Sequence, residues 1–360
     1  MERWDAVVVG AGAMGSATAR ALAERGRSTL VLERFRVGHA RGSSHGATRI
    51  FRLAYHHPDY VRMARLALEQ WRELESRSGR SLLRQTGGLD LGPGAAVAAD
   101  AVSEAGVGFE WLSPEAVAER WSGVRLDVGT KALFQADAGV CRATETVAAQ
   151  AELALRAGAE LREETIVTGL APAGDRVEVR TAEGGHRAAV AVLTAGAWVP
   201  RLAPMKLAVT RELVTYFGRD PAPLPTVIEW SNGPARYAVP DPWRPEEVKL
   251  AEHMAGHPVD PDTEPPERPT PSERCTEWSR QRFRGIGGAI AAETCLYTTT
   301  PDEDFVLQRV GPVVVGSPCS GHGFKFAPLI GETLARLATG EAPAFPLQRF
   351  AWPRGSSPVR

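Results

Sequence analysis

Apolar residues near the start of the chain follow a strand, helix, strand pattern. Residues 5–9 are mostly apolar, which is typical of a parallel strand that is buried on both faces. From Ser16 the apolar spacing becomes helical, and the predicted helix stops at Gly26. Residues 29–32 predict a second strand, which Glu33 follows directly. Between the first strand and the helix lies the turn GAGAMG, residues 10–15.

The same spacing predicts further elements along the chain. Apolar positions predict helices over residues 60–74 and 144–156, the second followed by Gly158 as a stop. Residues 86–91 predict a turn into a strand, and residues 192–198 a strand with a small-residue ending. Strand-like runs at 207–214, 226–230 and 237–239 predict an antiparallel sheet. Residues 257–273, rich in Pro, Asp and Glu, predict an exposed connection, and residues 352–360 a loose tail.

The order of these elements predicts a mixed α/β chain of two domains. The sequence has 360 residues, and one hydrophobic core stops growing near about 250–300 residues. We expect a Rossmann-like nucleotide-binding domain formed by residues 1–88, 138–204 and 296–360. An antiparallel-sheet substrate domain, residues 89–137 and 205–295, is expected to be inserted into it.

Composition and charge narrow the possible partners. The 42 basic and 43 acidic residues give a net charge of -1, which argues against nucleic acid or an anionic membrane as partner. The four cysteines form no CxxC pair, so we expect no metal site and no disulfide framework. The start of the chain lacks the features of a secretory signal, and no apolar run reaches the length of a membrane span. These features predict a cytoplasmic protein.

The turn GAGAMG matches the dinucleotide-binding pattern GxGxxG. Gly10 permits the tight turn, Gly12 lets the backbone approach a pyrophosphate, and Gly15 lets helix and strand pack closely. The N-terminus of the helix that follows the turn offers free N–H groups to the phosphates, and Ala13 and Met14 of the turn are expected at the cofactor. Glu33, 23 positions after Gly10, is placed to accept hydrogen bonds from a ribose. The context favours a dinucleotide site, but this pattern alone does not separate FAD from NAD.

Three further stretches resemble the monomeric sarcosine oxidase family and its N-methyltryptophan and pipecolate oxidase relatives. They read GSSHGATRIFR at residues 42–52, CLYTTTPDE at 295–303 and SGHGFKF at 320–326. The ending of the strand at residues 192–198 also resembles a strand that returns to the nucleotide domain in related flavoproteins. With the glycine turn, the resemblance spans almost the whole chain in order.

This resemblance implies FAD as cofactor, attached covalently through the sulfur of Cys295. Arg49 and His45 are implied to supply a positive environment beside the flavin, which favours an accessible thiolate. Lys249 matches the lysine that promotes oxygen reduction. The remaining residues expected at the cofactor are Arg34, Ser43, Ser44, Thr48, Val167, Ala195, Gly196, Trp198, Gly321, His322, Gly323, Phe324 and Lys325.

The resemblance also implies a place for the substrate. Arg52 and Lys325 are expected to hold its carboxylate, because a guanidinium and an ammonium suit a small anion. Tyr237, Tyr297 and His253 match residues of the family's substrate pocket. The implied reaction is oxidation of a secondary amino acid, N-methyl or cyclic, by hydride transfer to flavin N5. Dioxygen then takes the electrons and leaves as hydrogen peroxide, and the imine hydrolyses. The family suggests a monomer.

Structural alternatives stand beside these assignments. Taken alone, Cys295 and Cys319 are small buried residues, Arg52 a surface arginine, Lys249 a solvent-facing lysine, and His253 a surface histidine. Two departures from the family weaken sarcosine itself as the substrate: Ala47 replaces an acid, and the segment between Lys249 and Cys295 is short and rich in proline.

Four other functions remain open at this point. Two are enzymes of the same architecture: an oxidase of glycine or D-amino acids, and a dehydrogenase that passes electrons to another acceptor. The third is a non-catalytic flavin-binding protein, which has no need for Arg52, Lys249 and Lys325 together. The fourth is a nicotinamide-linked dehydrogenase, which would purify colourless.

Overall fold

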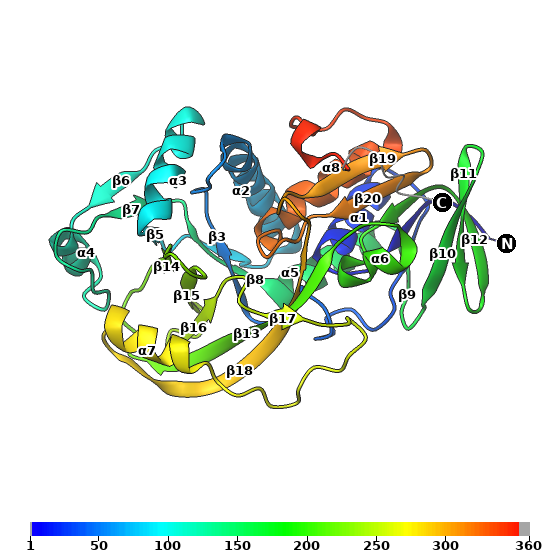
Figure 1. Ribbon diagram of the computed structural model, residues 1–360. Coiled ribbons are helices and arrows are strands. Elements are labelled where there is room, and N and C mark those ends of the chain that lie inside the picture. The colour runs from blue at the N-terminus through cyan, green and yellow to red at the C-terminus, as the bar shows by residue number, and fades with distance from the viewer. Residues whose placement is uncertain (1, 353–360) are drawn as a thin grey trace.

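The computed structural model describes residues 2–352. It confirms the predicted mixed α/β fold, with two large sheets side by side and helices packed around them (Figure 1). The helices are α1 (Ala13–Glu24), α2 (Pro58–Ser78), α3 (Pro93–Glu104), α4 (Pro114–Arg120), α5 (Ala143–Arg156), α6 (Val199–Leu202), α7 (Glu273–Arg282) and α8 (Ala327–Thr339). Three short 3₁₀ turns are η1 (Gly196–Trp198), η2 (Phe324–Phe326) and η3 (Gln348–Phe350).

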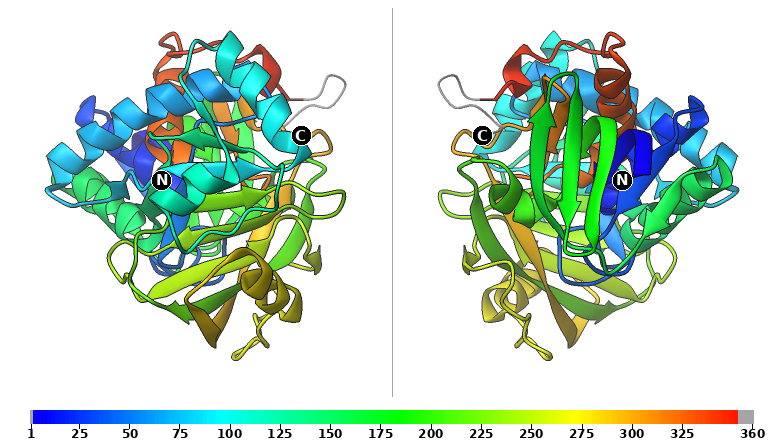
Figure 2. Two further views of the ribbon diagram at one scale, coloured as in Figure 1. Left: turned by 90° about the vertical axis from the view of Figure 1, so that its left-hand side faces the viewer. Right: turned by 90° about the vertical axis from the view of Figure 1, so that its right-hand side faces the viewer.

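The first sheet contains the predicted strand, helix, strand unit. Its strands are β1 (Glu2–Val9), β2 (Thr29–Leu32), β9 (Glu160–Arg162), β10 (Val167–Ala173), β11 (Arg176–Thr181), β12 (Gly184–Leu193), β19 (Val306–Val310) and β20 (Val313–Ser317). The central strands β9, β2, β1, β12 and β20 are parallel, and the last four residues of β1 are all buried. At one edge, β10, β11 and β12 form an antiparallel ribbon, which faces the viewer in Figure 2 (right).

Along the chain, the strands of the second sheet come partly before and partly after residues 160–193, which form strands β9 to β12 of the first sheet. Its strands are β5 (Gly88–Leu91), β6 (Glu110–Leu112), β7 (Ala132–Gln135), β13 (Ala208–Arg219), β14 (Thr226–Glu229), β15 (Arg236–Pro240), β16 (Glu247–Glu252), β17 (His257–Pro258) and β18 (Ile286–Thr299). A small third sheet contains β3 (Thr48–Phe51), β4 (Leu83–Arg84) and β8 (Gly139–Arg142). It places the residue 42–52 motif beside both large sheets.

Three expectations change in detail. The second sheet is antiparallel except for the pair β5–β14, which is parallel. The connection at 257–273 contains the short strand β17. Its acidic residues form ion pairs with arginines outside the connection, such as Asp262 with Arg34 at 2.8 Å. Trp352 does not begin a loose tail: it is buried in a core, and its N–H donates to Gln308 Oε1 at 2.6 Å. Residues 353–360 of the predicted tail lie outside the described range.

The two helices predicted from apolar spacing, over residues 60–74 and 144–156, are present as α2 and α5. Their end residues and buried faces explain why they form. Helix α2 begins after His57, whose ring accepts from the N–H of Asp59, and ends at Gly79 in the left-handed conformation. Its buried face includes Trp71 and Leu74. Helix α5 covers residues 143–156, close to the predicted range, and α1 packs between α5 and α8.

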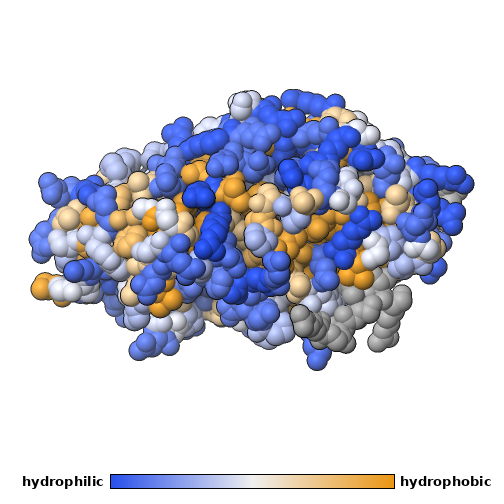
Figure 3. Space-filling view, turned by 90° about the horizontal axis from the view of Figure 1, so that it is seen from above, coloured by the Kyte–Doolittle hydropathy of each residue, from blue (hydrophilic) through white to orange (hydrophobic). Residues whose placement is uncertain are grey.

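The surface gives no sign of a membrane span. Among residues 2–352, no helix is long and apolar enough to cross a bilayer. The face seen from above carries mostly hydrophilic residues, with apolar ones gathered toward its middle (Figure 3).

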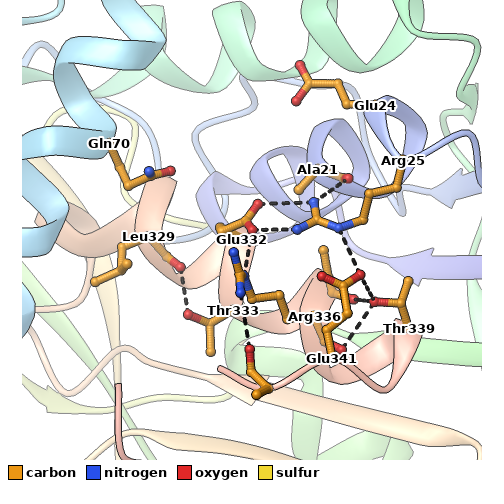
Figure 4. A network of polar contacts seen from close by, with 12 residues as sticks. Ala21, Glu24, Arg25, Gln70, Leu329, Glu332, Thr333, Arg336, Thr339 and Glu341 are labelled. Carbon is orange, nitrogen blue, oxygen red and sulfur yellow. Dashed lines mark hydrogen bonds and ion pairs between the residues drawn. The ribbon is translucent and has the colours of Figure 1, made fainter. Parts of the chain in front are cut away.

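A polar network joins the end of α1 to α8 (Figure 4). The carboxylate of Glu332 accepts from Arg25 Nη1 at 3.1 Å and from Arg336 Nε at 2.8 Å, and Arg25 also reaches Glu341 at 3.3 Å. Burial alone would raise the pKa of Glu332, but the hydrogen bonds from Arg25 and Arg336 leave it below the usual value. The network therefore ties the helix of the glycine turn to the last helix.

We predict that Glu332→Gln lowers the free energy of unfolding by about 1 kcal/mol, because a charged pair of hydrogen bonds at a half-exposed site is lost. Urea denaturation measures this, with the exposed Glu119→Gln as control. Because folding lowers the pKa of Glu332, the difference in unfolding free energy between wild type and variant should be present above pH 4.5. This difference should shrink as the pH falls below 4.5. A difference that persists in acid would contradict the account.

Candidate active site

The glycine turn joins β1 to α1 in the way that the sequence predicts. Gly10 has φ +94°, and a side chain there would place Cβ 2.8 Å from the carbonyl oxygen of Thr194. A Cβ on Gly15 would lie 1.7 Å from the carbonyl oxygen of Gly10. Both positions therefore require glycine, and the turn brings the N-terminal end of α1 to the edge of a cavity.

Glu33 lies at the end of β2, facing this turn. Its buried carboxylate accepts from the N–H of Ala11 at 2.7 Å and from the N–H of Phe35 at 2.8 Å. Ser44 Oγ accepts from the N–H of Ala13 at 3.1 Å. The turn is thus fixed by side chains from two other segments, and Glu33 still lines the cavity.

The cavity has a volume of about 840 Å³ and extends from the glycine turn to the second sheet. Most predicted site residues line it: Gly10, Gly12, Ala13, Met14, Glu33, Arg34, Ser43, Ser44, Arg49, Arg52, Val167, Ala195, Gly196, Trp198, Tyr237, Lys249, His253, Cys295, Tyr297, Gly321, His322, Gly323, Phe324 and Lys325. One cavity therefore collects residues from almost the whole length of the chain.

Three predicted residues do not line the cavity. Gly15 lies within α1, behind the turn. His45 is buried, and its Nε2 lies 3.0 Å from the carbonyl oxygen of Thr294, next to Cys295. Thr48 is also buried, and its carbonyl oxygen accepts from Lys249 Nζ. These residues support the wall of the cavity from behind.

Two basic side chains meet near Cys295. The guanidinium of Arg49 donates to the carbonyl oxygens of Ser43, at 3.0 Å, and His45, at 2.7 Å. Lys249 is buried, not solvent-facing, and burial together with the charge of Arg49 lowers its pKa to about 7. Burial holds the pKa of the Cys295 thiol above its usual value, although the charges of Arg49 and Lys249 act to lower it.

A second basic cluster, Lys325 with Arg52, lines the part of the cavity that His253 and His322 also line. Lys325 Nζ donates to Tyr55 Oη at 2.8 Å and to the carbonyl oxygen of His322 at 2.7 Å. Burial, followed by the charge of Arg52, lowers the pKa of Lys325 well below its usual value. The same causes lower the pKa of His253 to about 4, so this ring is neutral at pH 7. This part of the cavity presents two basic side chains beside neutral rings and suits a small anion.

Sequence comparison agrees with this geometry. Residues 5–337 match the family described as DAO: FAD dependent oxidoreductase. The chain belongs to this family of FAD-dependent oxidoreductases. It is 33% identical to a monomeric sarcosine oxidase of a Bacillus species, covering 93% of each chain. It is 29% identical to N-methyl-L-tryptophan oxidase of Salmonella agona, covering 98% of this chain and all of that one.

A solved structure supports the same family. NikD, an unusual amino acid oxidase essential for nikkomycin biosynthesis, superposes with a TM-score of 0.85 at 29% identity, covering 98% of each chain. The predicted family and the predicted enzyme class, an FAD-dependent oxidoreductase, are therefore confirmed.

The cavity of this FAD-dependent oxidoreductase fits the cofactor that the family implies. Side chains do not fit at Gly10 and Gly15, so the turn stays tight, and the start of α1 lies at the cavity, where a helix N-terminus suits a phosphate. Glu33 retains lone pairs for ribose hydroxyls. The guanidinium of Arg49 contacts backbone carbonyls, and no carboxylate pairs with it among residues 2–352, so negative charge that develops on a ring beside it would be stabilised.

Several residues that line the cavity were not predicted from the sequence. Tyr55 follows Arg52 closely, so its position just after the residue 42–52 motif could have identified it as a cavity residue. Asp262 lies in the proline-rich connection, and Trp230 lies before a turn, so neither stood in a recognisable motif. Within the described residues, no group of three or more His, Cys, Asp or Glu side chains is arranged to hold a metal.

We predict that Gly10→Ala sharply reduces the FAD retained by the purified protein, because Cβ would collide with Thr194 and the residue would be strained at positive φ. The visible flavin absorbance per chain measures this. Gly108→Ala, where Cβ meets nothing within 4 Å, is the matched control. Equal flavin content in the two variants would contradict the proposed use of this turn.

Proposed function

We propose that the enzyme oxidises a secondary amino acid, N-methyl or cyclic, with dioxygen as electron acceptor. The observation that carries this proposal is one cavity with Arg52 and Lys325 at one end and the Arg49, Lys249 and Cys295 group along its wall. The relatives named sarcosine oxidase and N-methyl-L-tryptophan oxidase support a substrate with a substituted amino group.

In this proposal, Arg52 and Lys325 bind the substrate carboxylate. Lys325 is held between Tyr55 and the carbonyl oxygen of His322, so its position is set before the ligand arrives. Tyr237, Tyr297 and neutral His253 form the wall that excludes water and orients the amine. Because His253 is uncharged, the charged contacts of the substrate carboxylate come from Arg52 and Lys325.

When bound, FAD would supply the acceptor for a hydride from the substrate carbon that bears the amine, and a route for the electrons to dioxygen. The protein holds the substrate by its carboxylate so that this carbon faces the cofactor. Lys249 supplies a buried cation that stabilises negative charge developing on dioxygen. Arg49 and the supporting His45 and Thr48 fix the wall between these groups.

We further propose that Cys295 attaches the flavin covalently. It lines the cavity, and two cations oppose the effect of burial on its thiol. Cys319 lines the same cavity, but its sulfur accepts from the N–H of Thr298 at 3.3 Å. The first sheet would then serve as the cofactor domain and the second as the substrate domain, in a monomer that works in the cytoplasm.

The proposal is tested by measuring hydrogen peroxide from the holoenzyme with sarcosine, L-proline, L-pipecolate, glycine and D-alanine. We expect peroxide with secondary amino acids, and Lys325→Met should raise KM at least about tenfold, because a charged hydrogen bond to the carboxylate is lost. Lys131→Met is the control, at an exposed lysine outside the cavity. Turnover of glycine or D-alanine alone would contradict the proposal.

Acid precipitation tests the covalent bond. We predict that the yellow colour stays with the precipitated wild-type protein and with Cys319→Ser, and moves to the supernatant in Cys295→Ser. Colour in the supernatant of wild type would leave the cofactor assignment standing and refute the covalent link.

The pH dependence of flavin reoxidation tests Lys249. Its ammonium form is the one that stabilises reduced oxygen, so with a pKa of about 7 the reoxidation rate should fall as the pH rises through neutrality. Lys249→Met should be slow at every pH, and Lys249→Arg should retain part of the rate. If reoxidation of Lys249→Met matches wild type, the role is wrong.

A further inference from the structure

Two residues beside Arg52 play no part in the function proposed above. Asp90 lies in β5 and Trp230 directly follows β14, and these two strands pair in parallel. The N–H of Trp230 donates to the carbonyl oxygen of Leu91 at 2.9 Å, which extends the pairing by one residue. The parallel pair therefore brings an acid and an indole to the same point, next to Arg52.

The carboxylate of Asp90 joins the other two side chains. Its Oδ1 accepts from Trp230 Nε1 at 2.9 Å and from Arg52 Nη1 at 3.3 Å. Asp90 is only 4% exposed, and it does not line the cavity itself. Arg52 and Trp230, which donate hydrogen bonds to Asp90, both line the cavity and connect Asp90 to it.

The indole of Trp230 is held on several sides. A Cβ on Gly94 would lie 2.5 Å from Trp230 Cγ, so the absence of a side chain there makes room for the ring. The guanidinium of Arg52 lies 5.2 Å from the centre of the indole and 4.5 Å from the centre of the Tyr55 ring. The ring of His56 lies 4.4 Å from the indole.

We propose that Asp90 is a positioning residue which, with Trp230, holds Arg52 in one orientation. We propose also that the indole makes this end of the cavity favour carboxylates that carry an apolar ring over the smallest carboxylates. This inference rests on the proposed function, because it takes Arg52 as the group that binds the substrate carboxylate.

The physical reason is the flexibility of arginine. A free arginine side chain loses rotamer freedom when it binds a ligand, and an anchored one has already lost it. Asp90 also cancels part of the positive charge of Arg52, so charge alone predicts that its removal tightens anion binding. Positioning predicts weaker binding on removal of the anchor, and the sign of the change separates the two effects.

Calorimetric titration of the holoenzyme with acetate and with benzoate tests the proposal. Asp90→Ala should weaken both ligands about fivefold to tenfold, because the side-chain anchor is lost and Arg52 Nη1 keeps only its hydrogen bond to the carbonyl oxygen of Ala54, at 2.6 Å. Asp90→Asn, which keeps an acceptor oxygen, should restore binding to wild-type strength or better. Trp230→Ala should weaken benzoate about tenfold more than acetate, because the ring contact is lost. Trp111→Ala, at a partly exposed tryptophan outside the cavity, is the control.

A double-mutant cycle separates positioning from a general effect on folding. If Asp90 acts through Arg52, then Asp90→Ala should add nothing in an Arg52→Ala background, whereas a structural defect would add to it. Should Asp90→Ala not fold, the benzoate-to-acetate ratio in Trp230→Ala still decides the claim about the ring.

The outcomes also distinguish this inference from the proposed function. Unchanged binding in Arg52→Ala would show that the carboxylate site itself is misplaced. Weakened binding in Arg52→Ala, with tightened binding in Asp90→Ala or an unchanged ligand ratio in Trp230→Ala, would overturn the inference and leave the proposed function intact.

Discussion

The site depends on keeping several basic side chains out of water in a single cavity. Lys249 and Lys325 are buried and Arg49 is only partly exposed, and burial is the main cause that lowers the pKa of both lysines. Burying charge is costly unless partners are supplied. The partners here are chiefly backbone carbonyls, those of Ser43, His45 and Thr48 for Arg49, and those of Thr48 and His322 for the lysines. Such neutral partners leave the positive charge of these side chains uncancelled, which suits negative charge that develops on a reduced cofactor and an anionic substrate.

The fold supplies these carbonyls by crossing distant segments. The residue 42–52 loop lies against β18, where Ser43 Oγ donates to the carbonyl oxygen of Leu296 at 2.5 Å. β18, the strand that carries Cys295, pairs along its length with β13 and is therefore anchored in the second sheet. Its C-terminal end contacts the residue 42–52 segment. The two large sheets lie side by side (Figure 1), and residues of both line the cavity.

Local patterns in the sequence predict the parts of the site that are continuous along the chain. The glycine turn and Glu33 are such a unit, as are the segments around Cys295 and Lys325, because each function there needs neighbouring residues in fixed order. Asp90 and Trp230 could not be found this way, since they meet only through a parallel strand pair across 140 residues. Asp262 belongs to a segment without core-forming residues, and Trp352 completes a core from the end of the chain. His45 and Thr48 lie in a motif of which residues 42–44, 49, 50 and 52 line the cavity, so motif membership alone does not reveal which residues reach it.

The most direct measurement is anaerobic mixing of the holoenzyme with amino acids while the visible flavin absorbance is followed. Without oxygen, loss of the yellow colour reports electron transfer from the substrate to FAD alone, whichever acceptor follows. We expect sarcosine, L-proline or L-pipecolate to bleach the flavin, and glycine and D-alanine to do so slowly or not at all. Bleaching by NADH or by primary amino acids alone, with none by secondary ones, would contradict the account.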